Sequence, residues 1–137
     1  MLYLNIPSAA KPKTPNVRAF KTAWFSKAAK KARIDDSALC ACFHQVLLGQ
    51  ADNLGGGVFK RRLNDNMHRA IILAKVGRSW IFEYLFAKKD RANIDDDELA
   101  QFRELAKAYA KLTEQQIEQL IDSNHLVEIC HANQVQI

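Results

Sequence analysis

The sequence predicts an α+β fold in which helices near both ends of the chain pack on a small antiparallel sheet. Apolar residues recur at helical spacing in residues 22–48 and again in residues 95–122. Between them, residues 58–87 contain three short alternating or apolar runs separated by turn residues, which is typical of strands. We therefore expect a sheet of about four strands, mainly a meander, with two N-terminal helices packed on it and two C-terminal helices.

The chain of 137 residues has the length of one domain, which we expect to span residues 17–129. Residues 1–16 contain all three prolines and are expected to form an extended arm, and residues 130–137 a short tail. No apolar run is long enough to cross a bilayer, and residues 1–10 lack the basic leader and cleavage site of a secretory signal. We therefore expect a cytoplasmic protein that has no membrane partner.

Two amphipathic helices are expected ahead of the meander. Residues 17–20 could form a short strand, and residues 22–33 fit a helix with Trp24 on its inward face and lysines on its outward face. Asp35 or Asp36 caps the second helix, which a glycine ends. Its apolar positions repeat every three or four residues, at Leu39, Cys42, Phe43, Val46 and Leu47.

The middle of the chain is expected to form the meander. Residues 52–57 are expected to form a turn, followed by strands at residues 58–63, 69–76 and 80–87. The turns between these strands contain only a few residues, which implies antiparallel pairing. A last short strand is expected at residues 126–129.

Two helices follow the meander. Asp95 and Glu98 have the spacing of a capping box, and Thr113 and Gln116 repeat this pattern at the start of a shorter helix. The acids that follow Asp95 are adjacent in a first helical turn, where side chains fan outward and negative charge favours the helix dipole. We therefore interpret them as a cap and not as a metal site.

Two other patterns are also interpreted as structural. Cys40, Cys42 and Cys130 lack the spacing of a zinc site, and the first two point to different sides of a helix, so we expect them to be buried small hydrophobic residues. Residues 55–57 are three glycines, but no Lys-Ser or Lys-Thr pair follows them, so we expect a turn and not a phosphate-binding loop. We expect neither a metal nor a cofactor.

Positive charge is concentrated in two segments of the chain, whose net charge is +5. Residues 11–33 hold eight Lys and Arg and no acid, and residues 60–91 hold nine against three acids, whereas residues 95–128 hold three against nine acids. On the alternating strand, Lys60 and Arg62 share one face. A cationic sheet face adds nothing to a core, so we interpret it as a surface for a polyanion and not as a set of unrelated solvated faces.

Taken in order, these segments resemble the RelE/ParE superfamily of toxins from bacterial type II toxin–antitoxin systems, above all its HigB-like and phage-encoded RelE-like members. The resemblance covers roughly residues 17–129 and is carried by Leu54–Leu63, Arg69, Phe86–Ile94 and Leu112–Ile129. It implies a metal-independent endoribonuclease, an mRNA interferase that inhibits translation and that in many relatives acts on the ribosome. It also implies a cognate antitoxin, with a helix-turn-helix as in HigB-like systems.

The resemblance also implies roles for individual residues. Lys60, Arg62 and Arg69 stand where the family places its cationic catalytic residues. Another family cation falls in a second basic cluster, for which we expect RNA binding: Lys88, Lys89 and Arg91. The chain departs from the family pattern in two places. The tyrosine expected after this cluster falls in the acidic stretch near Asp95, and His68 stands where a tyrosine is common.

Metal-independent RNA cleavage requires deprotonation of a 2′-hydroxyl, compensation of the charge that grows on the phosphorane, and protonation of the leaving 5′-oxygen. Arg62 and Arg69 suit charge compensation, because guanidinium groups match phosphate oxygens. Lys60 is a candidate base, since its neighbours are cationic. His68 is a candidate acid or base, with a surface turn histidine as the alternative. Arg61 is expected on the opposite face, as a structural residue or a helix partner.

A non-enzymatic function remains open on these residues alone. The chain could be a ParE-like gyrase inhibitor, or a basic domain that binds nucleic acid or a partner without cleaving it. The cationic set of Lys60, Arg62 and Arg69 favours the ribonuclease, because ParE-like members usually lack it. The missing tyrosine favours the binding protein.

Overall fold

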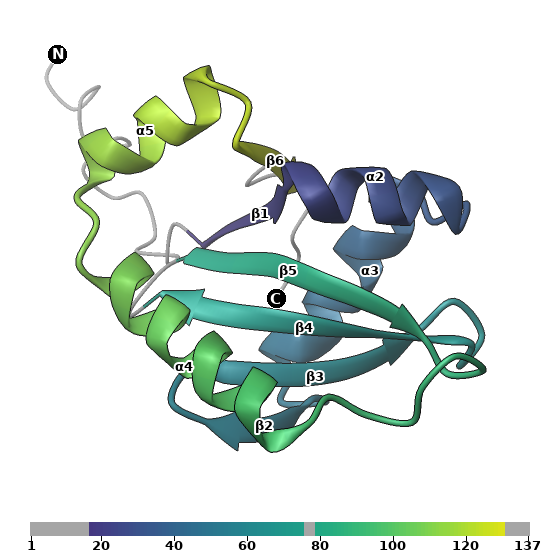
Figure 1. Cartoon of the computed structure of the whole chain (residues 1–137). Helices are drawn as coiled ribbons and strands as arrows, with labels where there is room; N and C mark the ends of the chain where they lie inside the picture. The colour runs from purple at the N-terminus through teal and green to yellow at the C-terminus, as the bar shows by residue number, and fades with distance from the viewer. Residues whose placement is uncertain (1–16, 76–78, 131–137) are drawn as a thin grey trace, which may run out of the picture.

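Four helices pack on one six-stranded mixed sheet within residues 17–75 and 79–130, which the computed structural model describes (Figure 1). The predicted arm at residues 1–16, part of the predicted turn at residues 77–79 and most of the predicted tail lie outside the described residues. In chain order the elements are β1 (Arg18–Thr22), α2 (Ala23–Lys31), α3 (Asp36–Leu47), β2 (Asp52–Gly55), β3 (Val58–Leu63), β4 (His68–Lys75), β5 (Ser79–Ala87), α4 (Asp96–Ala110), α5 (Glu114–Asp122) and β6 (Leu126–Cys130).

The predicted α+β class is confirmed, but the predicted sheet of about four antiparallel strands is wrong. The strand order is β2-β3-β4-β5-β1-β6, and only β3, β4 and β5 form the expected antiparallel meander. The short strand β1 lies between β5 and β6, where it pairs parallel with β5 and antiparallel with β6. This insertion makes the sheet mixed. The partners of β1 lie about sixty and more than a hundred residues further along the chain, so no local pattern reports them.

The predicted turn at residues 52–57 is partly a strand, because β2 folds back on β3. The reversal uses Gly55, Gly56 and Gly57, all of which have positive φ angles. Arg103 of α4 donates a hydrogen bond of 2.5 Å to the Leu54 carbonyl, and a Cβ on Gly56 would lie 2.8 Å from the Arg103 Cγ. The glycine turn therefore also forms a packing surface for Arg103 of α4.

The two faces of the sheet are covered by different helices. Helices α2 and α3 pack on one face, and Figure 1 shows α4 crossing the other. Helix α5 closes the end of the sheet around β1 and β6. The buried centres of the three clusters are Phe25, Leu39, Phe43, Ile72 and Phe82 for the first, Val58, Ile71, Leu73 and Ala106 for the second, and Phe20, Ile81, Ile117 and Leu126 for the third.

The helix starts follow the predicted caps. Asp35 caps α3, and both capping boxes form, one between Asp95 and Glu98 and the other between Thr113 and Gln116.

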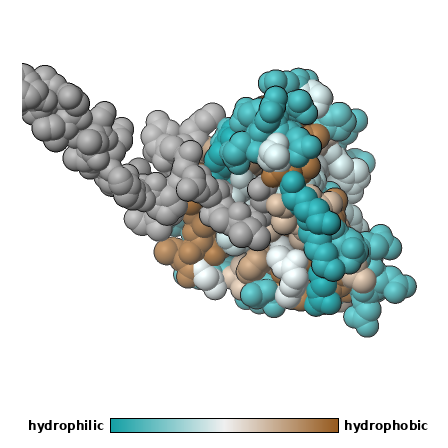
Figure 2. Space-filling view, turned by 90° about the vertical axis from the view of Figure 1, so that its left-hand side faces the viewer, coloured by the Kyte–Doolittle hydropathy of each residue, from teal (hydrophilic) through white to brown (hydrophobic). Residues whose placement is uncertain are grey.

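The molecular face that carries α4 and α5 is covered mainly by hydrophilic residues (Figure 2). Among the described helices, none has the length and apolar character needed to cross a membrane.

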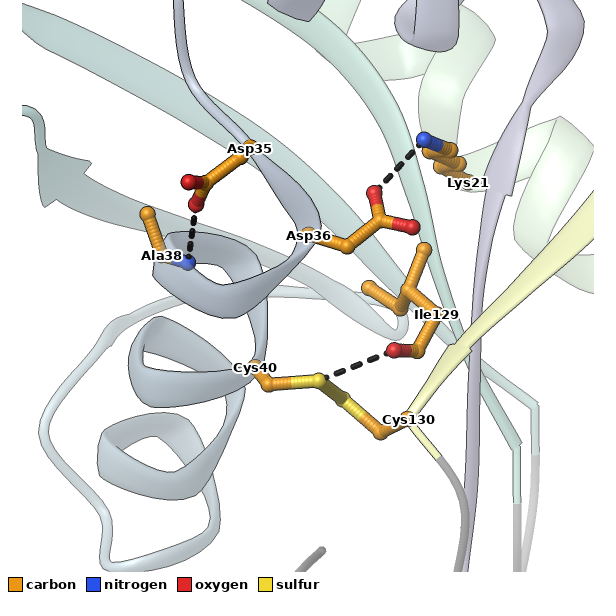
Figure 3. Close-up of a disulfide and its surroundings, with 7 residues drawn as sticks. All are labelled: Lys21, Asp35, Asp36, Ala38, Cys40, Ile129 and Cys130. Carbon is orange, nitrogen blue, oxygen red and sulfur yellow. Dashed lines mark hydrogen bonds and ion pairs between the residues drawn. A yellow bond between two sulfur atoms is a disulfide. The ribbon is translucent and has the colours of Figure 1, made fainter.

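Two predictions about buried side chains are corrected. Trp24 was expected to point inward but is 52% exposed. Cys40 of α3 and Cys130 of β6 form a disulfide with a Cα–Cα distance of 5.7 Å, so they are not simple hydrophobic residues (Figure 3). Only Cys42 is a buried free cysteine, and its burial raises the pKa of the thiol to about 11. The disulfide closes a separation of 90 residues and ties α3 to the edge strand β6.

One half-buried carboxyl links β5 to α4. Glu83 accepts a hydrogen bond of 3.1 Å from the hydroxyl of Tyr109. Desolvation by burial raises the pKa of Glu83 to about 7, and the hydrogen bond from Tyr109 opposes part of that rise. Burial also raises the pKa of Tyr109. The folded protein therefore holds a proton on Glu83 at a pH where the unfolded chain has released it.

We predict that Glu83→Gln removes a pH dependence of folding stability. Because the pKa of Glu83 is raised on folding, its stabilising contribution is complete below the ordinary carboxyl pKa and is lost as pH rises to about 7. Glutamine stays neutral and still accepts from Tyr109. In thermal melts between about pH 5 and pH 8, the variant should gain several degrees relative to the wild type as pH rises. A difference in melting temperature that is constant with pH would contradict this account.

Candidate functional site

Three of the predicted site residues lie together on one sheet face. Lys60 and Arg62 alternate with Arg61 along β3, and the register of β3 with β4 places Arg62 directly opposite Arg69. Lys60 lies one rung away, opposite Ile71. Helix α4 packs on this face of the sheet, over Val58, Ile71 and Leu73. The three cations lie on the same face, toward the far end of β3 and the start of β4. We call Lys60, Arg62 and Arg69 the cationic face.

Each cation is held differently. Arg69 donates hydrogen bonds from Nη1 to the carbonyls of Asn66, at 2.9 Å, and His68, at 3.1 Å, so the turn between β3 and β4 orients its guanidinium. Lys60 donates to the side chain of Asn93 at 3.3 Å. Arg62 is exposed. Hydrogen bonds to neutral oxygens fix Lys60 and Arg69 in place without cancelling their charge.

The cationic face has no carboxylate partners among the described residues. In the described part of the chain, the ion pairs include none to Lys60, Arg62 or Arg69, although Asp52 of β2 lies opposite Lys60 in the register. Two arginines directly opposite each other in an antiparallel pair repel, which destabilises the folded state. An anion that binds between them would relieve this repulsion. Phosphate oxygens fit such a site well, because a guanidinium can donate two parallel hydrogen bonds to them.

Arg91, expected to bind RNA, is already paired. It makes two hydrogen bonds to Glu98, at 2.9 and 2.5 Å, donates to the Tyr84 hydroxyl at 3.3 Å, and lies 5.7 Å from the centre of the Phe86 ring. The hydrogen bonds to Glu98, and to a smaller extent the one to Tyr84, raise the pKa of Arg91. In turn, Arg91 holds the pKa of Glu98 below its usual range. Arg91 also donates to the backbone carbonyl of Asn93. It therefore orders the segment that contacts Lys60.

Lys88 and Lys89 are exposed in the turn after β5 and border a groove of about 1050 Å³. The groove runs beside the second half of β5, where α2 packs. Trp24 lines it and stacks on Tyr84, with ring centres 5.1 Å apart and an angle of 26° between the rings. Helical periodicity in the sequence places Trp24 in the core and therefore does not reveal this pair. The sequence does hold one sign of this position. Trp24 and Phe25 are adjacent in a helix and so point in different directions, which means that only one of them can lie at the centre of the inward face.

His68 is not brought to the cationic face. It is the first residue of β4, opposite Leu63, and it precedes Arg69, so the two side chains point to opposite sides of the sheet. Its Nδ1 lies 3.0 Å from the side-chain nitrogen of Asn64. Burial lowers the pKa of His68, with a smaller lowering by Lys89 and an opposing effect of Asp90. The predicted strand began one residue later, which hid this orientation.

Arg61 lies where the alternation predicts, on the face opposite Lys60 and Arg62. Its guanidinium donates to the side chain of Gln45 on α3, so it is a helix partner. Its Nε is buried and has no hydrogen-bond partner among the described residues. Of the three consecutive basic residues, Lys60 and Arg62 therefore lie on the cationic face, whereas Arg61 lies against α3.

The acidic residues of the described chain form no metal centre. No group of three His, Cys, Asp or Glu side chains in that part of the chain is placed to hold a metal ion. Asp95 and Glu98, which begin the acidic stretch, instead cap α4, and Glu98 additionally pairs with Arg91.

One comparison with known protein families covers most of the chain. Residues 17–129 match a family model described as RelE toxin of RelE / RelB toxin-antitoxin system. The chain belongs to the RelE toxin family. The match extends from the start of β1 into β6 and so covers every element that bears the site. No curated protein and no solved structure matches the chain. Family membership implies a toxin of a toxin–antitoxin system with a cognate antitoxin as its partner.

We predict that Arg62 and its neighbour Arg61 respond oppositely to anions. Arg62→Ala should melt no lower than the wild type at low salt, because it removes the repulsion with Arg69, and should lose much of the stabilisation by sulfate. Arg61→Ala should destabilise the fold by about 1 kcal/mol through lost contact with α3, while its response to sulfate stays that of the wild type. Thermal melts in sulfate and in chloride at equal ionic strength measure both. A full sulfate response in Arg62→Ala would exclude this anion site.

Proposed function

We propose that this RelE family toxin is a metal-independent endoribonuclease that cleaves mRNA and thereby inhibits translation, with mRNA on the ribosome as its substrate. One observation carries the proposal: Lys60, Arg62 and Arg69 meet on one sheet face as cations without carboxylate partners among the described residues. A phosphodiester in this position would find three positive groups, two of them guanidinium groups.

The positions of these groups support a division of roles. The phosphorane formed by 2′-hydroxyl attack carries an extra negative charge, and Arg62 and Arg69 would compensate it from two neighbouring strands. Arg69 is oriented in advance by the carbonyls of Asn66 and His68, so little reorganisation is needed when charge develops. Lys60 would take the proton of the 2′-hydroxyl and deliver it to the leaving 5′-oxygen, with Asn93 setting its direction.

Two predicted residues have different roles in this proposal. Arg91, paired with Glu98, would act through the segment that carries Asn93 and would not contact phosphate directly. His68 receives no part in the reaction, because its side chain lies on the other side of the sheet from Arg69. Lys88 and Lys89 keep the role of contacting RNA phosphates outside the cleaved bond.

The cognate antitoxin would neutralise the toxin by covering or adjoining the cationic face, and we propose that it carries a helix-turn-helix that also binds the operator. Charge complementarity supports this arrangement, since an acidic segment would replace the missing carboxylates. Co-expression with the neighbouring reading frame and gel filtration tests it. Failure to obtain a stable complex would contradict the proposal that the neighbouring reading frame encodes the antitoxin.

Induced expression with primer extension on cellular mRNA tests the proposed activity. We expect growth arrest together with new 5′ ends within transcripts, and neither effect with a folded Arg69→Ala protein. Growth arrest with intact transcripts and poisoned gyrase would favour a ParE-like inhibitor and contradict the ribonuclease.

We predict that Arg69→Ala and Lys89→Ala separate chemistry from binding. Arg69→Ala should slow single-turnover cleavage roughly 10²-fold or more, since it deletes a preorganised charge-stabilising donor, and should weaken RNA binding less. Lys89→Ala should weaken binding mildly, reduce the slope of affinity with salt by about one, and leave the cleavage step intact. The measurements are single-turnover cleavage and RNA affinity at two salt concentrations, with thermal melts as the folding control. Undiminished cleavage by a folded Arg69→Ala protein would remove Arg69 from the mechanism.

A further inference from the structure

Packing of the hydrophobic core does not explain why a tryptophan stands at position 24, because the Trp24 ring is largely exposed. A tryptophan that is 52% exposed leaves much of its apolar area in water, and truncating it would cost the core little. Among the described residues, its one close aromatic contact is the stack on Tyr84. Phe25, the next residue, is fully buried with Phe82 on the side of the sheet that α3 covers.

Trp24 and Phe25 therefore contact opposite sides of the sheet. Tyr84 lies opposite Ile71, in the same cross-strand row as Lys60, and packs in the cluster beneath α4. Since Trp24 stacks on Tyr84, its ring contacts the side of the sheet that carries the cationic face at the edge of β5, where the groove also reaches Leu85 of the opposite side. Two strand spacings separate Tyr84 from Lys60 in this row, roughly 10 Å.

The stack is rigidly supported. Tyr84 is packed between Trp24 and two further aromatic rings, with centre distances of 5.9 Å to Phe86 and 5.9 Å to Phe102. Arg91 donates to the Tyr84 hydroxyl and so limits rotation of that ring. A platform held in this way loses little entropy when a flat ligand stacks on it.

The charges around the groove favour an anionic ligand. Lys31 of α2, with Lys88 and Lys89 of the turn after β5, borders the groove and is exposed. Two acids also line it, Asp65 and Asp90. These three lysines form no ion pair among the described residues and outnumber the two acids, and Arg91 is balanced by Glu98. A flat aromatic surface bordered by lysines, on the side of a phosphate site, is the combination by which proteins bind single-stranded nucleic acid.

We propose that Trp24 is a stacking platform for one base of the RNA substrate, next to the phosphate held at the cationic face. This inference rests on the proposed ribonuclease function and adds a binding subsite to it. The base stacks on the open face of the Trp24 ring, and Lys31, Lys88 and Lys89 contact the flanking phosphates. A protein segment is the competing occupant, and an abasic RNA separates the two, because only a stacked base is lost at an abasic site.

The test compares Trp24→Ala, Trp24→Phe and the wild type on two RNA oligonucleotides, one complete and one with a single abasic site beside the cleaved bond. For the complete RNA, Trp24→Ala should lose roughly 5- to 100-fold in affinity, and Trp24→Phe should recover most of it. Cleavage at saturating RNA should change much less. The wild type should lose affinity on the abasic RNA, whereas Trp24→Ala should bind both RNAs equally.

Leu48→Ala is the matched control, because Leu48 is 54% exposed at the end of α3 and lies outside the groove. Its RNA affinity should equal that of the wild type. If the wild type cleaves RNA but Trp24→Ala binds both oligonucleotides as the wild type does, the platform is excluded and the ribonuclease stands. If Trp24→Ala binds RNA normally but no longer binds the antitoxin, the groove is a protein site and the proposal fails. If the wild type neither binds nor cleaves RNA, both proposals fail together.

Discussion

The pairing of β3 with β4 is the constraint on which the rest of this structure depends. Its register brings Val58 opposite Leu73 at one end and Arg62 opposite Arg69 at the other. The apolar end packs under α4 and stabilises the pairing, whereas the charged end opposes it through repulsion. A slip by one residue would turn Lys60 and Arg62 toward the face that α3 covers and Val58 away from α4, so burial of the apolar residues on both faces maintains the cationic face.

Helix α4 joins this face to the rest of the molecule. Glu98 in its first turn completes the capping box and binds Arg91, which fixes the segment carrying Asn93 beside Lys60. Further along, Arg103 binds the glycine turn between β2 and β3. The acidic start of the helix therefore has two functions, one for the helix itself and one for the loop next to the site. These contacts explain why an acidic stretch follows the second basic cluster so closely.

The opposite edge of the sheet depends on long-range contacts. Arg18 of β1 binds Glu128 of β6 and Glu118 of α5, and the Cys40–Cys130 disulfide adds a covalent link from α3 to the same strand. Disulfides persist in oxidising compartments and are uncommon in the cytoplasm, so this link and the cytoplasmic expectation favour different environments. With β1 in place beside the first half of β5, α2 must pack along the second half. That position presents Trp24 to solvent.

The helix pattern, the capping residues and the alternation that separates Arg61 from Lys60 and Arg62 were all determined by sequence alone, because each depends on residues at most a few positions apart. Tertiary structure decided the parallel insertion of β1, the disulfide between Cys40 and Cys130, and the exposure of Trp24. These depend on segments that meet across sixty or more residues, and local spacing carries no record of them. Arg91 is an intermediate case. Glu98 was recognised as a cap, but which cation it would bind was settled only by the path of the turn after β5.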